Sequence, residues 1–194
     1  IQHAMALDCH IDQYFQQRQK TPNSRNRRAR LVIGGGGFTG VELACEIVGY
    51  VKKLSRKYGF KANTVEIVII DAVKQLLGLG ERVSQIVHTR LKKLGINTIL
   101  GAKIIKFNGK TLFLQHISNN SQIQKGIRSQ PCEALATDIL IWTGGIKANH
   151  LIQNFQQLHP SGALETQSTL EATYYPGVYA GGDNAAVIDP KTKK

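Results

Sequence analysis

Apolar and polar residues alternate along this chain in a way that separates short buried strands from amphipathic helices. Four short, mostly apolar runs have the character of strands buried in a parallel sheet. They cover residues 31–33, 65–70, 97–100 and 138–142. Apolar positions at helical spacing predict helices, and these cover residues 4–17, 41–57 and 82–94. Strand, helix and strand in succession form a βαβ unit, so the pattern predicts an α/β fold.

A different pattern of shorter extended pieces begins near residue 103. The pair Asn108-Gly109, placed between residues 103–107 and 110–116, is a typical hairpin turn. The polar stretch at residues 118–130 predicts a loop or an irregular hairpin. Two further strand-like pieces are expected later in the chain, and they cover residues 163–165 and 177–180.

The composition indicates a globular chain and excludes several other classes. The 194 residues are 42% hydrophobic and 20% charged, and no apolar stretch approaches the roughly 18 residues of a membrane-spanning helix. The 19 glycines and 5 prolines are scattered without a period, which argues against collagen-like and disordered chains. The cysteines Cys9, Cys45 and Cys132 form no CxxC pair and no zinc spacing. We therefore expect reduced thiols in a cytoplasmic chain and no metal site.

The charge of the chain is strongly positive. A formal net charge of +12 at pH 7 favours anionic partners, namely nucleic acid, anionic lipid headgroups or phosphate-bearing ligands. The densest basic cluster combines Arg25, Arg27, Arg28 and Arg30, and no aromatic residue is interleaved with it. A stacking platform for single-stranded nucleic acid therefore finds no support, and we expect no nucleic-acid partner. An anionic membrane surface stays open as a partner, beside the alternative of a solvated basic face.

A glycine-rich turn follows the first strand and opens the next helix. It consists of Gly35, Gly36, Gly37, Phe38, Thr39 and Gly40, which satisfy the GxGxxG pattern. In this pattern the first glycine permits a sharp turn, the second lets the backbone approach a pyrophosphate, and the third lets the helix pack closely on the strand. The N–H groups at the start of the helix can then bind phosphates. The sequence predicts a dinucleotide site here, and a structural glycine turn without a ligand is the alternative.

An acidic residue, Asp71, stands at the end of the second strand. Its carboxylate would accept hydrogen bonds from ribose hydroxyls and repel a 2′-phosphate, so it favours NAD over NADP. Lys74 lies close by in the sequence and weakens that preference. The number of residues between Gly40 and Asp71 is larger than in the usual fingerprint, which we attribute to a longer helix and its exit loop.

Residues 32–44 closely resemble the NADH-binding turn of type II NADH dehydrogenases, members of the FAD-dependent pyridine nucleotide-disulfide oxidoreductase superfamily. Residues 136–145 are similar to the strand and turn by which the family's chain leaves its NADH domain. Residues 177–183 resemble the family's second flavin-binding motif. Three motifs in the right order, spread over residues 4–187, are far more specific than one.

The resemblance implies a fold and a domain organisation. It implies a Rossmann-like, three-layer NADH-binding domain with a parallel sheet and a small antiparallel meander, followed by a partial return into an FAD-binding domain. Residues 1–30 would be a linker helix and loop from the flavin domain, residues 31–147 the NAD(H)-binding domain, and residues 148–194 the return segment. We therefore expect the chain to be an internal fragment of a longer protein.

The same resemblance assigns roles to individual residues. Gly35, Gly37, Gly40 and Asp71 would bind the phosphates and ribose of NADH. The backbone of two further glycines, Gly144 and Gly145, would lie against the dinucleotide.

Two acidic residues complete the assignment. Glu42 would lie near the nicotinamide and the flavin and is the catalytic candidate, the alternative being an ordinary acid in the first helical turn. Asp183 would hold the ribityl chain of FAD, the alternative being a turn residue.

The chemistry implied for the full-length parent is hydride transfer from NADH to FAD, followed by electron transfer to a quinone. We expect the parent to be a peripheral enzyme on the cytoplasmic face of a membrane, with quinone contacts in a C-terminal region and with a homodimer left open. The fragment alone would be inactive. Alternatives are a sulfide:quinone or ferredoxin reductase relative and a non-catalytic NAD-binding module. The lack of a cysteine pair speaks against the sulfide reductase, and Asp183 speaks against the non-catalytic module.

Overall fold

The computed structural model describes residues 2–21, 27–117, 132–145 and 147–187. The chain divides into two compact units, the first ending at Gly144 and the second beginning at Gly145. The expected loop at residues 118–130 lies outside the described residues.

A parallel sheet forms the centre of the first unit. Its strands are β1 (Ala29–Gly34), β2 (Val65–Asp71), β3 (Ile96–Leu100) and β7 (Ile139–Trp142). They pair in the order β3-β2-β1-β7, and Leu31 of β1 is in register with Ile67 and Ile139 on its two sides. Because all the strands are parallel, their carboxyl ends meet at one edge of the sheet. The predicted α/β class is confirmed.

Three helices belong to this unit, namely α1 (Gln2–Lys20), α2 (Phe38–Tyr58) and α3 (Glu81–Lys93). The side chains of Leu31 and Ile33 point from β1 into the core shared with these helices. Ile11 and Phe15 fill the same core from α1, and the Phe15 ring stacks on Phe60 with 4.7 Å between centroids. The helix α2 ends at Gly59, which is left-handed with φ 68° and donates its N–H to the Ser55 carbonyl.

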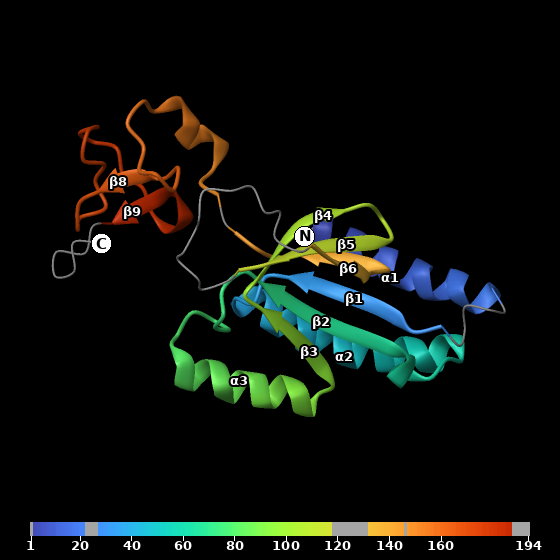
Figure 1. Cartoon of the computed structure of the whole chain (residues 1–194). Helices are drawn as coiled ribbons and strands as arrows, with labels where there is room; N and C mark the ends of the chain where they lie inside the picture. Colours follow the sequence, from blue (N-terminus) through green and yellow to red (C-terminus); the bar gives the residue numbers. More distant parts are fainter. Residues whose placement is uncertain (1, 22–26, 118–131, 146, 188–194) are drawn as a thin grey trace. The chain divides into compact units, whose positions relative to one another are not determined.

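An antiparallel meander covers the opposite face of the sheet (Figure 1). It comprises β4 (Ala102–Phe107), β5 (Thr111–His116) and β6 (Cys132–Ala136), paired in the order β4-β5-β6. Alternate sheet residues, Val32 and Val68 among them, point away from the helices and pack on Leu112 and Leu114. The predicted three-layer arrangement, with helices, parallel sheet and meander, is confirmed.

The second unit is small. It holds the 3₁₀ helices His150–Asn154 and Gly182–Asn184, and the parallel pair β8 (Leu164–Thr166) and β9 (Ala185–Val187). The strand expected at residues 177–180 is wrong, since only one isolated bridge joins Tyr179 to Glu171. Gly177 has φ 79°, so the backbone turns there instead of extending.

Candidate functional site

The glycine-rich loop lies at the carboxyl end of β1, between the ends of β2 and β7, and hydrogen bonds tie it to both neighbours. On the β2 side, the Gly35 N–H donates to the Ile70 carbonyl over 2.8 Å, and the Leu77 N–H donates to the Gly36 carbonyl over 2.9 Å. On the β7 side, the Thr143 N–H donates to the Gly34 carbonyl over 2.9 Å. The loop therefore has a fixed shape before any ligand is present.

Two of its glycines are required by the fold itself. Gly35 has φ 125°, and a Cβ added there would lie 2.7 Å from the Thr143 hydroxyl oxygen and 2.9 Å from the Gly144 nitrogen. A Cβ added at Gly40 would lie only 1.9 Å from the Gly35 carbonyl oxygen. A side chain at either position would push the loop and the start of α2 apart.

Gly37 is different. Its φ of −74° and ψ of −175° are open to any residue, and no heavy atom of the described chain lies within 4 Å of an added Cβ. Gly37 is also the N-cap of α2, where no side chain caps the helix and no acidic residue occupies the first turn. The first N–H groups of a 21-residue helix are thus open to an anion, and the helix dipole adds positive potential.

The Asp71 carboxylate lies beside the glycine-rich loop and is hydrogen-bonded to it. Its Oδ2 atom accepts the Gly36 N–H, and its Oδ1 atom accepts the Val73 N–H over 2.7 Å. The side chain is half-buried, and each oxygen retains a second lone pair for another donor. The aliphatic stem of Lys74 lies over Gly101, where an added Cβ would come within 3.2 Å of it.

Contacts bring several of the predicted residues together. Gly35, Gly36, Asp71 and Gly144 meet through the hydrogen bonds and close approaches described above, and Phe38, Thr39 and Gly40 follow directly as the first turn of α2.

Glu42 lies further along α2 and is exposed, with no hydrogen bond or ion pair to any residue that the structure describes. Because the first turn holds no acidic residue, its alternative interpretation as a first-turn acid is wrong.

Gly145 and Asp183 belong to the second unit. Gly145 is exposed with φ 79°, and Asp183 is exposed in the short helix Gly182–Asn184. No hydrogen bond of the Asp183 carboxylate is found among the described residues, so the group is free to accept donors from a ligand.

Two residues at the end of β7 play a larger part than the sequence suggested. The Thr143 hydroxyl donates to the carbonyls of Gly34 and Gly35, over 3.2 and 3.4 Å. Trp142, the single tryptophan, ends an apolar strand and is nevertheless 63% exposed. The indole lies against Gly34, where an added Cβ would come within 2.8 Å of it, so a side chain at position 34 would displace the ring.

The chain is similar to known proteins along nearly its whole length. The family model of the pyridine nucleotide-disulphide oxidoreductases matches residues 4–193. The chain belongs to this family. It is 28% identical over 194 residues to the type II NADH:quinone oxidoreductase of Haemophilus influenzae, covering 97% of this chain and 39% of that protein. The enzyme of the same name from Staphylococcus saprophyticus is 24% identical over 187 residues, covering 95% and 43%. The chain thus spans about two fifths of the length of these oxidoreductases.

Solved structures show the same fold. A structure of NDH2 from Plasmodium falciparum in complex with NADH superposes with a TM-score of 0.72 at 22% identity, covering 90% of this chain and 36% of that one. A NAD-dependent persulfide reductase from A. fulgidus superposes with a TM-score of 0.56 at 20% identity, covering 86% and 27%. These likenesses confirm the Rossmann-like fold of the flavoprotein family.

Within the described ranges, no group of three or more His, Cys, Asp or Glu side chains could hold a metal ion. Cys9, Cys45 and Cys132 are free thiols. Across the same part of the chain, no helix combines the length and apolar character that crossing a bilayer needs.

Proposed function

We propose that this chain is the NADH-binding portion of a FAD-dependent NADH dehydrogenase, which transfers hydride from NADH to FAD and passes the electrons on to a quinone. Gly37 carries the proposal. Neither its backbone angles nor any described neighbour requires glycine there, whereas the close approach of a pyrophosphate to the backbone does. Membership of the family, and relatives named type II NADH:quinone oxidoreductase, support the same function.

In this proposal the glycine-rich loop binds the dinucleotide through its backbone. The N–H groups of Phe38 and Thr39, at the uncapped start of α2, would donate hydrogen bonds to the pyrophosphate. Asp71 would accept the ribose hydroxyls on the lone pairs that Gly36 and Val73 leave free. Its negative charge would disfavour the additional phosphate of NADPH.

The remaining assigned residues concern the flavin and the reacting rings. Bound FAD would supply the hydride acceptor. Asp183, whose carboxylate is exposed and free among the described residues, would accept hydrogen bonds from the ribityl chain. The exposed carboxylate of Glu42 would lie near the nicotinamide and flavin rings as the catalytic candidate. The backbone of Gly144 and Gly145 would lie along the dinucleotide.

The domain assignment belongs to the same proposal. Residues 1–30 would link from a flavin domain, residues 31–147 would bind NAD(H), and residues 148–194 would return into the flavin domain. The whole protein would be a peripheral enzyme at the cytoplasmic face of a membrane, with an anionic lipid surface, a quinone and a second copy as candidate partners.

Calorimetric titration of the 194-residue chain with NADH and NADPH tests the binding part of the proposal. We expect saturable binding of NADH that is tighter than that of NADPH. A matched pair of variants locates the site, because Gly37→Ser blocks the backbone approach while Gly49→Ser lies in open space further along α2. Equal affinity in both variants, or no NADH binding by a folded chain, would contradict the proposal. The catalytic part is tested on the full-length protein with FAD, by following NADH-dependent reduction of a quinone.

One observation favours a second candidate function, a flavoprotein reductase acting on sulfur compounds. The structural likeness to a NAD-dependent persulfide reductase supports it. Against it, Cys45 packs beside the helical core and Cys132 is an exposed residue at the start of β6, so neither forms a thiol pair within the described ranges. The full-length protein, offered a quinone and a persulfide in separate assays with NADH, distinguishes the two functions.

A further inference from the structure

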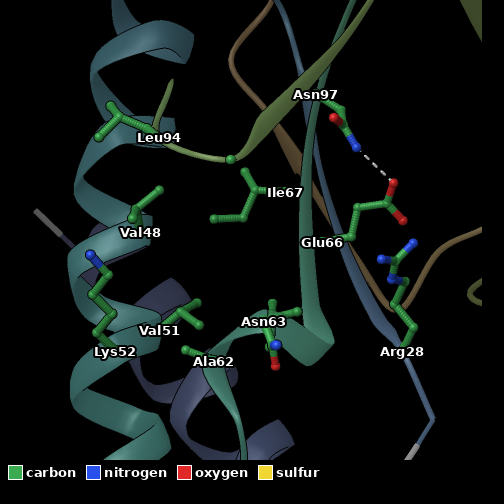
Figure 2. A pocket seen from close by; sticks show the side chains of 12 residues that line it. Arg28, Val48, Val51, Lys52, Ala62, Asn63, Glu66, Ile67, Leu94 and Asn97 are labelled. Carbon is green, nitrogen blue, oxygen red and sulfur yellow. Dashed lines mark hydrogen bonds between the residues drawn. The ribbon is translucent and has the colours of Figure 1, made fainter. Parts of the chain in front are cut away.

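A hollow opens at the edge of the parallel sheet opposite the glycine-rich loop. Its volume is about 530 Å³, within the roughly 300–1,000 Å³ range of small-molecule sites. It lies between α2, the start of β2 and the turn from α3 into β3 (Figure 2). Glu66, on its rim, and Asp71, beside the loop, are five residues apart on β2, which is about 16 Å at the usual strand rise. The two sites are therefore separate.

The floor of this hollow is apolar. Val48 and Val51, one turn apart on α2, lie across from Ile67 of β2, and Leu94 closes the upper side in Figure 2. Val51 and Ile67 are buried, whereas Val48 and Leu94 are only partly buried. Val48 and Leu94 pack against the main core here and leave part of their apolar surface facing the hollow.

The rim of the hollow carries net positive charge. Glu66 is its only acidic lining residue in the described chain, and both of its carboxylate oxygens are occupied. One oxygen accepts the Arg30 Nε–H over 2.9 Å and the other accepts the Asn97 amide over 2.9 Å. The side chains of Arg28 and Lys52, by contrast, are exposed and make no hydrogen bond or ion pair with the described residues. Two cations are therefore available at the rim, and the one anion is already neutralised.

We propose that this hollow binds an amphipathic anion, whose apolar part lies on Val48, Val51, Ile67 and Leu94 and whose carboxylate or phosphate is met by Lys52 or Arg28. An apolar floor with a few charged groups at its rim is the usual composition of a small-molecule site. Net positive charge selects an anion over a neutral or cationic amphiphile. The proposal does not depend on the dinucleotide function, because it uses none of the residues of the glycine-rich loop.

The test compares dodecanoate with dodecanol, which has the same chain without the charge, on the 194-residue protein below the micelle concentration. Calorimetry gives the affinity, and amide chemical shifts locate the contact. We expect saturable dodecanoate binding, with shifts confined to residues around the hollow. Dodecanol should bind at least tenfold more weakly.

Charge-reversal variants make the test specific. Lys52→Glu and Arg28→Glu should each weaken dodecanoate binding, by at least tenfold in one of them. Lys53→Glu, the same charge change on the neighbouring α2 residue that does not line the hollow, should leave it unchanged. Amide spectra of all three variants establish that they are folded. Equal losses in Lys52→Glu and Lys53→Glu, non-saturable binding, or shifts elsewhere would overturn the proposal.

Discussion

Gly37 and Gly40 belong to one motif, yet the structure gives them opposite sensitivities to a side chain. We predict that Gly37→Ser leaves the protein as stable as before, because the backbone angles at position 37 suit any residue and an added Cβ meets open space among the described atoms. Serine is also a favourable N-cap, and it loses less backbone entropy on folding than glycine does. The free energy of unfolding should therefore change by no more than about 1 kcal/mol, in the stabilising direction.

Gly40→Ala should behave in the opposite way. Its Cβ would lie 1.9 Å from the Gly35 carbonyl oxygen, a backbone atom that cannot move aside without shifting the loop. Overpacking of this kind costs about 1–3 kcal/mol of folding free energy. Urea unfolding followed by circular dichroism measures both variants against the parent chain.

NADH affinity distinguishes a glycine needed for the ligand from a glycine needed for folding. If the Gly37 backbone faces the pyrophosphate, a serine side chain there should cost one charge-assisted hydrogen bond, worth about 1.5–3 kcal/mol. That free energy corresponds to roughly a 10- to 150-fold increase in the Kd for NADH. Trp142 lies beside the loop and is the single tryptophan, so its fluorescence reports the titration directly. Unchanged NADH affinity in Gly37→Ser, or destabilisation as large as in Gly40→Ala, would refute the reasoning.

Three other substitutions test cofactor preference, the stability of the loop and the pH dependence of folding. Asp71→Asn keeps a hydrogen-bond acceptor for the loop but removes the negative charge. The ratio of NADPH affinity to NADH affinity, measured by calorimetry, should therefore rise. An unchanged ratio would show that Asp71 does not select the cofactor. Thr143→Val removes a hydroxyl that bonds the Gly34 carbonyl and should lower the unfolding free energy by about 0.5–1.5 kcal/mol in urea. Hydrogen bonds from Lys57 and from the Tyr58 hydroxyl hold the pKa of Asp12 below its ordinary 3.8, so they stabilise the fold above that pH and are lost as acid protonates Asp12. The thermal midpoint of Asp12→Asn should therefore fall less on acidification than that of the parent, and parallel curves would count against the link.

Local sequence patterns predicted the first unit well, because its strands and helices carry their own periodicity. The run around Leu31 and Ile33 is continuously apolar, as a strand covered on both faces has to be. The second unit was harder to predict, since β9 (Ala185–Val187) is three residues long and exists through its pairing with β8. The strand expected at residues 177–180 was wrong because the pairing there is limited to one isolated bridge, between Tyr179 and Glu171.

In the candidate site, too, local features could be predicted from the sequence and long-range contacts could not. The positions of the glycines and of Asp71 could be predicted from spacing, since the motif is local. The contact of the Trp142 indole with Gly34 could not, because it joins residues more than a hundred positions apart in the sequence. The hollow beside Val51 was also unpredictable, because its lining residues come from α2, the start of β2 and the turn after α3, which are far apart in the sequence.

The double role of Asp71 has a consequence for evolution and engineering. The carboxylate that would discriminate between the two nicotinamide cofactors also fixes the loop, by accepting the N–H groups of Gly36 and Val73. A lineage that exchanges it for a smaller or basic residue gains room for a phosphate but releases both main-chain donors at once. A change of cofactor preference in this scaffold should therefore arise as a coupled pair of substitutions, the second one supplying a new acceptor for the loop.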